Sequence, residues 1–137
     1  MGHKFAELAF TPNVKAEQAA RGSRRAYERF AQGEDHHDIL GPQEAAFIGM
    51  RDSFYMATVS ETGWPRIQHR GGPAGFLKVL DEKTIGFADF RGNRQYISVG
   101  NLKSDDRMSL FFMDYANKAR LKILGRARIV DASDGET

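Results

Sequence analysis

The stretch Arg107–Ile129, RMSLFFMDYANKARLKILGRARI, decides the fold class of this chain. Its first third is strongly apolar as far as Asp114, and residues 115–118 (YANK) have the composition of a turn. Beyond the turn the side chains alternate, with Leu121, Ile123, Ala127 and Ile129 on one side and Lys122, Arg126 and Arg128 on the other. A period of two is typical of a strand with one covered face. The pattern therefore predicts an antiparallel hairpin.

Upstream of this hairpin the sequence predicts four more strands, at residues 53–60, 65–70, 76–80 and 84–89. A single helix, from about Asn93 to Lys103, separates the fourth strand from the hairpin. Six strands joined by short turns, with one helical interruption, favour an antiparallel barrel over a parallel α/β sheet. We therefore expect a mainly β (α+β) fold: a six-stranded antiparallel barrel with N-terminal helices and one helix after strand 4.

The N-terminal part has a helical period. Thr11-Pro12 predicts the start of a helix that continues to Gly33, and Gly41-Pro42 predicts the start of a second, short helix. The arginine-rich face of the first helix is interpreted as solvated, although contact with RNA or an acidic partner is the alternative. We expect one domain over residues 1–137, with a helical extension at 1–50 and the barrel at 51–130.

The composition excludes several classes of protein. A net charge of +2 is too small to indicate a nucleic-acid binder, and without cysteine there can be no disulfide, thiolate nucleophile or iron–sulfur cluster. No signal peptide and no membrane-spanning run is visible, so we predict a cytoplasmic protein. The cluster Glu34–Asp38, EDHHD, is interpreted as a polar loop, and no metal site is expected.

Two stretches suggest a ligand site. The first is Phe87–Leu102, where an apolar run reaches Gly92 and two arginines, an asparagine and a glutamine follow at the expected start of a helix. Free backbone N–H groups and arginines together suit an anion such as a phosphate ester. The second is the strand at 65–70, which places Arg66, Gln68 and Arg70 on one side, a polar face that is unusual in an apolar sheet.

Several ordered motifs between Gln43 and Val130 carry a family resemblance. They are Gly63-Trp64-Pro65, His69-Arg70-Gly71-Gly72, Gly75-Phe76, Gly92-Asn93-Arg94 and Leu124-Gly125-Arg126-Ala127. Together they resemble the pyridoxamine 5'-phosphate oxidase-like family, and within it the flavin-nucleotide-binding branch. The resemblance implies a split β-barrel, usually a homodimer, that holds FMN at the subunit interface and serves as an oxidoreductase.

The resemblance also implies which residues bind the cofactor. In the family, the strand bearing Gln68, His69 and Arg70 and the strand end at Ala88 and Asp89 line the flavin. The segment at Asn93, Arg94 and Gln95 grips the phosphate, and Arg120 falls near a position that contacts the isoalloxazine. No catalytic residue is assigned.

Two departures from the family pattern argue against oxidation of pyridoxamine phosphate. The oxidase proper carries Ser-Arg-Lys where this chain has Asn93-Arg94-Gln95, so one positive charge on the phosphate is missing. Family members also continue past Thr137, which suggests that the C-terminus is truncated.

The sequence leaves three functions open. The favoured one is an FMN-dependent oxidoreductase that acts on an unidentified small molecule, as a homodimer and without nucleic-acid or membrane partners. The alternatives are a non-catalytic flavin-binding carrier, sensor or electron relay, and a phosphate- or nucleic-acid-binding module without flavin. An aromatic-lined basic groove would favour the last of these.

Overall fold

The structure is a computed structural model of the chain, and it describes residues 4–32, 39–88 and 97–129. Contacts divide the chain into two compact units: residues 1–42 with 81–84, and residues 43–80 with 85–137. Residues 81–84 group with the first unit, in which the Leu40 amide donates a hydrogen bond to the Glu82 carbonyl at 2.6 Å. The two units are described separately.

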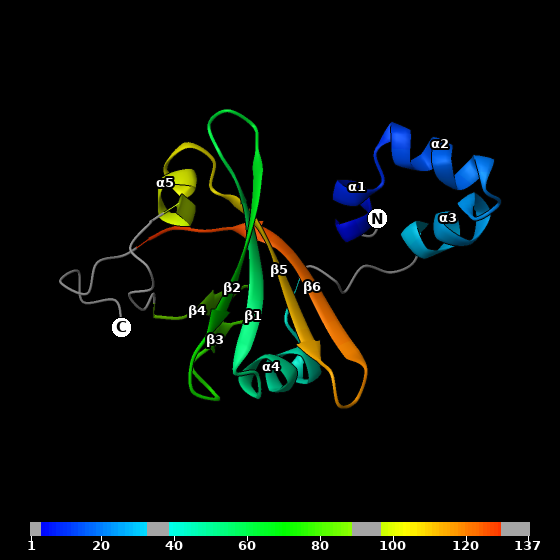
Figure 1. The fold of residues 1–137 in the computed structure, drawn as a ribbon. Coiled ribbons are helices and arrows are strands. Elements are labelled where there is room, and N and C mark those ends of the chain that lie inside the picture. Colours follow the sequence, from blue (N-terminus) through cyan, green and yellow to red (C-terminus); the bar gives the residue numbers. More distant parts are fainter. Residues whose placement is uncertain (1–3, 33–38, 89–96, 130–137) are drawn as a thin grey trace. The chain divides into compact units, whose positions relative to one another are not determined.

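The first unit contains three helices: α1 (Lys4–Ala9), α2 (Pro12–Ala20) and α3 (Arg24–Gln32) (Figure 1). The predicted helix start is confirmed, because the Thr11 side chain caps α2 by accepting a hydrogen bond from the Val14 amide at 3.3 Å. The prediction of one continuous helix up to Gly33 is wrong. Gly22 has a φ of +84°, a conformation that ends a right-handed helix, so α3 begins anew at Arg24.

The second unit contains most of the β structure within the described residues (Figure 1). Its elements, in chain order, are α4 (Pro42–Gly49), β1 (Ser53–Val59), β2 (Pro65–Gly71), β3 (Lys78–Asp81), β4 (Thr84–Gly86), α5 (Ile97–Ser104), β5 (Arg107–Asp114) and β6 (Ala119–Arg126). Pro42, the last residue of β3, the first of β4 and the turn between them group with the first unit. The short helix after Gly41 and all six strands were predicted, and the structure confirms them. Residues 93–96, where the helix before β5 was expected to begin, lie outside the described residues.

The six strands form two antiparallel sheets, one with the order β2-β1-β5-β6 and a second made of β3 and β4. The fold is therefore α+β with antiparallel sheets, as expected, but the strand pairs of the described residues do not close one six-stranded barrel. Residues 72–75 account for the break after β2. Pro73 lacks a backbone N–H for a sheet ladder, and Gly75 has a φ of +84°.

The register of the larger sheet sorts its side chains onto two faces. Residues directly opposite each other in an antiparallel pair share a face. The inner face carries Phe54, Met56 and Thr58 of β1, Arg66, Gln68 and Arg70 of β2, Leu110 and Phe112 of β5, and Leu121 and Ile123 of β6. The outer face carries Tyr55 and Ala57, Ile67 and His69, Ser109, Phe111 and Met113, and Arg120, Lys122 and Leu124.

The inner face is the hydrophobic core of the second unit. Phe54, Met56, Leu110 and Phe112 are buried there, and rings surround Phe54: Phe87 at 5.0 Å, Phe112 at 5.6 Å and Phe76 at 5.9 Å between centroids. Aromatic pairs at such distances add to the stabilisation that burial alone provides. The cluster joins β1 and β5 to the segments that flank β3 and β4.

Arg51 fixes α4 to one end of the sheet. Its Nε donates to the carbonyl of Phe47 in the last turn of α4, and its Nη1 donates to the carbonyl of Met113 in β5, both at 3.1 Å. The Arg51 guanidinium also lies 4.4 Å from the Phe47 ring centroid and 3.6 Å from Asp114. The last carbonyls of a helix lack intrahelical partners. Arg51 therefore caps the C-terminal end of α4 and also connects this helix to β5.

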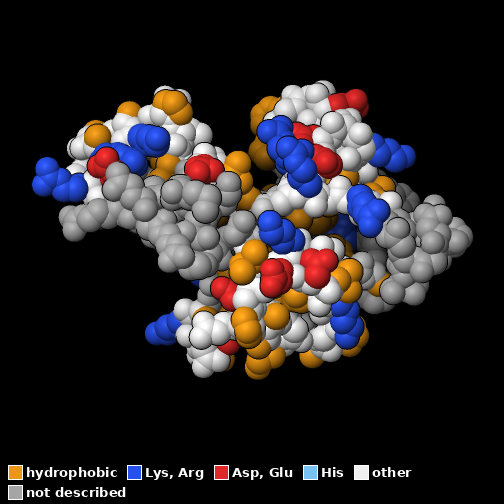
Figure 2. All heavy atoms as spheres, turned by 180° about the vertical axis from the view of Figure 1, so that it is seen from behind, with side chains coloured by type: hydrophobic (Ala, Val, Ile, Leu, Met, Phe, Trp, Pro, Cys, Tyr) orange, Lys and Arg blue, Asp and Glu red, His pale blue; other side chains and the backbone are white. Residues whose placement is uncertain are grey.

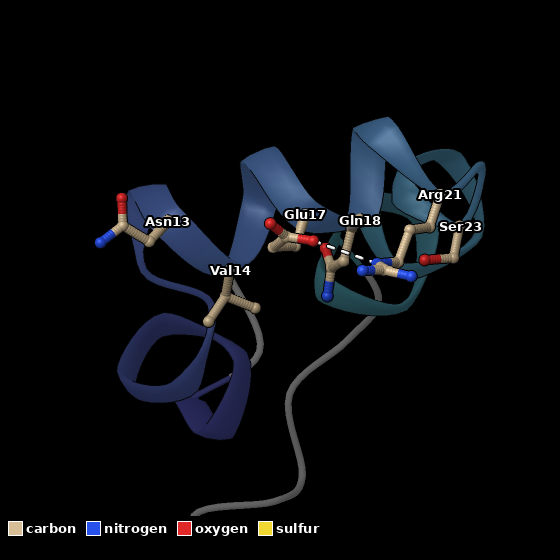
Figure 3. Close-up of a pocket in the computed structure, with 6 residues that line it drawn as sticks. All are labelled: Asn13, Val14, Glu17, Gln18, Arg21 and Ser23. Atoms are coloured by element: carbon tan, nitrogen blue, oxygen red, sulfur yellow. Dashed lines mark hydrogen bonds and ion pairs between the residues drawn. The ribbon is translucent and has the colours of Figure 1, made fainter.

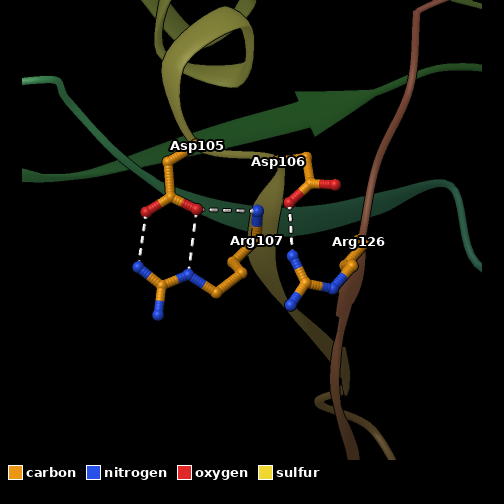
Figure 4. A network of polar contacts seen from close by, with 4 residues as sticks. All are labelled: Asp105, Asp106, Arg107 and Arg126. Atoms are coloured by element: carbon orange, nitrogen blue, oxygen red, sulfur yellow. Dashed lines mark hydrogen bonds and ion pairs between the residues drawn. The ribbon is translucent and has the colours of Figure 1, made fainter.

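Two acidic residues between α5 and β5 hold the other end of the sheet (Figure 4). Asp105 accepts hydrogen bonds from the Nε, Nη2 and backbone amide of Arg107 at 2.9, 2.6 and 3.0 Å. Asp106 accepts one from Arg126 of β6 at 2.6 Å. The hydrogen bonds from Arg107 lower the pKa of Asp105 from 3.8 to about 2.

The surface mixes charged and apolar groups. On the face seen in Figure 2, Lys and Arg side chains are spread out with Asp and Glu among them, and hydrophobic side chains reach the surface in several places. In the part of the chain that the structure describes, no helix is long and apolar enough to cross a membrane. The His36-His37 segment lies outside the described residues.

We expect Gly72→Ala to lower the free energy of unfolding by about 1–3 kcal/mol, the usual cost of overpacking. A Cβ at this position would lie 2.9 Å from Cγ of Phe76, so the ring would have to leave its place beside Phe54. Urea unfolding would measure the loss. Gly49→Ala is the matched control, because a Cβ there meets nothing within 4 Å. Equal stability of the two variants would contradict this packing.

We expect the stabilising effect of Asp105 to depend on pH. Its pKa of about 2 in the folded protein lies below the ordinary value of 3.8, so its contribution is complete above pH 3.8 and is lost as pH falls towards 2. The wild type should therefore exceed Asp105→Asn in free energy of unfolding at neutral pH, and the difference should shrink through this window. Glu61→Gln, in the exposed β1–β2 turn, should show no such convergence in urea unfolding.

Candidate functional site

The polar side of β2 is covered and its apolar side is exposed, the reverse of an ordinary amphipathic strand. Arg66, Gln68 and Arg70 are half-buried on the inner face, as the alternation predicted, whereas Ile67 on the outer face is 71% exposed. Turning two arginines towards a hydrophobic core is unfavourable unless they have partners there. This inversion marks the inner face at β2 as a candidate binding site.

Arg66 is the member of this row that most clearly requires a partner. Its Nε is shielded from solvent and makes no hydrogen bond within the described part of the chain. A buried donor left unsatisfied costs about 1–3 kcal/mol, so native structures rarely retain one without a role. The sequence pattern placed Arg66 on the polar face of β2, but Arg66 was not among the predicted cofactor-binding residues. Because Arg66 alternates with Gln68 and Arg70, the strand period could have identified it as a third member of that group.

Arg70 lies at the aromatic end of the same row. It is opposite Phe54 of β1, and its guanidinium carbon lies 5.7 Å from the ring centroid of Phe87. This distance is within the range of a cation–π contact. Since a strand rises about 3.4 Å per residue, Arg66 and Arg70 are separated by roughly 13–14 Å along β2. The site thus has two cationic ends with Gln68 between them.

The Arg66 end of the row is polar on both strands. Arg66 is opposite Thr58 of β1, whose hydroxyl accepts a hydrogen bond from Nδ2 of Asn101 in α5 at 3.0 Å. Thr58 is 1% exposed and Asn101 8% exposed, so this bond is buried. Helix α5 is therefore anchored to β1 immediately beside Arg66.

The structure brings some of the predicted site residues together and separates others. Gln68 and Arg70 share the inner face with Arg66, whereas His69 and Arg120 lie on the outer face of the same sheet. Ala88 is exposed at the end of a described segment. Asp89, Asn93, Arg94 and Gln95 lie outside the described residues, so their predicted roles stay predictions.

The outer face has its own group of polar aromatic residues. The His69 and Tyr55 rings are 5.4 Å apart, edge to face, and the Tyr55 hydroxyl lies 3.4 Å from the Tyr115 hydroxyl. This hydrogen bond raises the pKa of Tyr115 above its usual 10.0. Residues here could reach a ligand only from the side of the sheet opposite Arg66.

The hollow shown in Figure 3 belongs to the first unit and lacks the chemistry of the β2 row. It measures about 330 Å³ and is lined by Asn13, Val14, Glu17, Gln18, Arg21 and Ser23. Its one arginine is already paired with Glu17 at 3.1 Å. No aromatic ring lines it, so it offers no platform for a planar ligand. Among the residues that the structure describes, no group of three metal-binding side chains occurs.

Comparison with known proteins identifies the family. The profile of the pyridoxamine 5'-phosphate oxidase family matches residues 40–137, which is more than half of the chain. The chain belongs to this family. The match begins just before α4 and includes both strands of the candidate site.

Two crystal structures share the fold at low sequence identity. One is a tagged histidine-to-alanine variant of HupZ from Group A Streptococcus, with a TM-score of 0.52 and 16% identity over 64% of this chain and 67% of that one. The other is a candidate pyridoxamine 5'-phosphate oxidase from Lactobacillus delbrueckii, with a TM-score of 0.51 and 18% identity over 65% of this chain and 67% of that one. No curated protein matches the chain.

Membership of the pyridoxamine 5'-phosphate oxidase family confirms the predicted resemblance and gives the protein a fold of the flavin-binding oxidoreductase type. The residues present fit such a cofactor. The shielded Nε of Arg66 offers a donor to an anion, and the rings around Phe54 offer an apolar surface. A charged donor and an apolar surface on one face suit a ligand with an anionic end and a planar ring.

We expect Arg66→Met to raise the free energy of unfolding of the ligand-free protein by about 1 kcal/mol, because it removes a shielded donor without a partner and keeps an unbranched side chain. Urea unfolding in a buffer without phosphate or sulfate would measure the change. Lys122→Met, on the exposed outer face, is the control and should change little. A loss of stability in Arg66→Met would show that Arg66 is a structural residue.

Proposed function

We propose that this protein adopts the split-barrel fold, binds FMN on the inner face at β2, and acts as an FMN-dependent oxidoreductase on a small molecule. The observation that carries the proposal is the half-buried row of Arg66, Gln68 and Arg70, in which Arg66 holds a shielded donor that lacks a partner within the described chain. Its support is the match to a family whose fold is of the flavin-binding oxidoreductase type.

In this proposal the phosphate lies at the Arg66 end of the row. A phosphate ester carries a charge of about −1.5 to −2 at neutral pH. Arg66 would donate to it from β2, and the predicted phosphate-binding residues Asn93, Arg94 and Gln95, which precede α5 in the chain, would donate to it as well. Arg70, at the aromatic end, would place positive charge near the ring rather than on the phosphate. Such a charge favours an electron-rich, reduced ring.

The chemistry would come from the cofactor. FMN supplies reversible hydride or electron transfer when bound. The inner-face positions of β1, β2, β5 and β6 carry no histidine, and their one carboxylate, Asp114 at the end of β5, is engaged by Arg51 at 3.6 Å and by Asn117 at 2.8 Å. These positions therefore lack an uncommitted general acid or base of the usual kind. The rings of Phe54, Phe76 and Phe87 would exclude water. The same absence supports the alternative proposal, a flavin carrier, sensor or electron relay without its own turnover.

We also propose a homodimer. His69 and Arg120 lie on the outer face, so they could contact a flavin only across an interface between two copies of the chain. Ile67 and Leu124 give this face exposed apolar surface, 71% and 40% exposed. The outer-face positions of the four strands include arginine and lysine but no acid, so this face would suit a partner surface that carries negative charge.

The direct test of the proposed function is the absorbance spectrum of the purified protein titrated with FMN. We expect a bound flavin that a reduced nicotinamide bleaches and that an acceptor restores. Binding without bleaching by any reduced donor would favour the carrier or relay. A protein that binds no flavin would refute both.

We expect Arg94→Ala to weaken FMN binding about ten- to a hundredfold. A charge-assisted hydrogen bond contributes about 1.5–3 kcal/mol, and each 1.4 kcal/mol corresponds to a factor of about ten in Kd. Fluorescence titration would measure the affinity. Arg25→Ala, an exposed arginine on α3 in the other unit, is the control. Unchanged affinity in Arg94→Ala would place the phosphate elsewhere.

A further inference from the structure

Phe87 directly follows β4, and two neighbouring rings determine how its own ring is oriented. The Phe87 ring lies 5.0 Å from the Phe54 ring at an interplanar angle of 72°, and 6.5 Å from the Phe76 ring at 76°. Both arrangements are edge to face, a geometry that aromatic pairs prefer. Phe54 is 1% exposed, so Phe87 packs against a fixed part of the core. The core therefore sets the orientation of the Phe87 ring.

The Phe87 ring in turn contacts Arg70 of β2. The guanidinium carbon of Arg70 lies over this ring at 5.7 Å from its centroid, within the range of a cation–π attraction. An arginine side chain has several rotatable bonds, so it keeps one conformation only where contacts hold it. Arg70 and Phe87 are both half-buried, so water screens their attraction less than it would on an open surface. Phe87 is thus one of the contacts that fix the Arg70 charge on the inner face.

The charge that Phe87 holds lies at the aromatic end of the polar row, where the proposed function places the flavin ring. Reduction of a flavin ring by two electrons and one proton adds one negative charge to it. A cation close to the ring stabilises this charged product more than the neutral oxidised ring, and the effect falls with distance and with access of water. The reduction potential of a flavin at this site would therefore depend on how firmly Arg70 is held.

We propose that Phe87 is a positioning residue that raises the reduction potential of the bound flavin by holding Arg70 in place. Phe87 was not among the predicted cofactor-binding residues, and it acts on the ring through Arg70. This inference rests on the proposed function, because it concerns the same site.

The test measures the midpoint potential of bound FMN in the wild type, Phe87→Leu, Arg70→Gln and the double variant. Leu keeps an apolar side chain without the ring, and Gln removes the charge. We expect the affinity for reduced FMN relative to oxidised FMN to fall about three- to tenfold in each single variant, which is a potential lower by about 15–30 mV for a two-electron couple. The double variant should fall no further than Arg70→Gln, because both changes remove one effect.

The contact itself can be tested without flavin, by urea unfolding of the same four proteins. A double-mutant cycle should give a coupling of about two- to thirtyfold in the unfolding equilibrium constant, the range of a cation–π pair. Losses that simply add would show that Phe87 does not hold Arg70, and would overturn the inference.

Two further variants are the controls. Phe87→Tyr keeps the ring, so it should keep the wild-type potential. Phe112→Leu removes another ring that packs on Phe54, at 5.6 Å from β5, and should lower stability without changing the potential.

An unchanged potential in Phe87→Leu, or an equal fall in Phe112→Leu, would overturn the inference and leave Phe87 a packing residue. If Phe87→Leu fails to fold, Phe87→Met takes its place, because it fills more of the space with a long apolar side chain that has no ring. An unchanged potential in Arg70→Gln would refute the inference only, whereas a wild type that binds no flavin would refute the proposed function as well.

Discussion

The register of β1 against β2 is the constraint on which the rest of this structure depends. Pairing Thr58 with Arg66 and Phe54 with Arg70 puts a polar row of β2 on the same face as the core residues of β1. A slip of one residue would turn Ile67 and His69 inwards and both arginines outwards. The hydrophobic pattern of β2 alone would favour that slip, since Ile67 is its one large aliphatic residue. The native register therefore has to be maintained by other contacts.

The elements around the sheet provide those contacts. The Gly63 turn, with a φ of +88°, sets the β1–β2 hairpin, and the ring cluster around Phe54 holds the opposite end of the pair. Arg51 secures the far end of β5 to α4, while Asp106 ties β6 to the end of α5. The polar row is thus held by a rigid frame, as binding residues generally need to be if they are to meet a ligand without rearrangement.

Strands and helices whose apolar residues recur at a clear spacing could be predicted from the sequence. β5 has the predicted bounds, because an apolar run between Asp106 and the YANK turn leaves little choice. The break at Gly22 could not be predicted from the pattern, since apolar residues on both sides continue the helical period and only the backbone conformation reveals the end. Separation of β3 and β4 from the main sheet was also missed. It depends on pairing between segments distant in the chain, which no local pattern encodes.

The candidate site was predictable in part. Alternation placed Arg66, Gln68 and Arg70 on one face, but it could not say which face would be covered, because that depends on the neighbouring strand. The resemblance assigned His69 and Arg120 to the flavin, and the structure places both on the outer face, opposite the row of Arg66, Gln68 and Arg70. Their role at a flavin stays a prediction. The buried pair of Thr58 and Asn101 has no signature in the sequence, since 43 residues separate its members.

Under the proposed function, the shielded Nε of Arg66 would couple the folding equilibrium to anion binding. Any anion that satisfies this donor binds the folded chain and not the unfolded one, so it shifts the folding equilibrium by mass action. Cells short of that ligand would hold a larger unfolded fraction, which proteases remove. The amount of folded protein would then rise with the concentration of that anion, even without any change in synthesis.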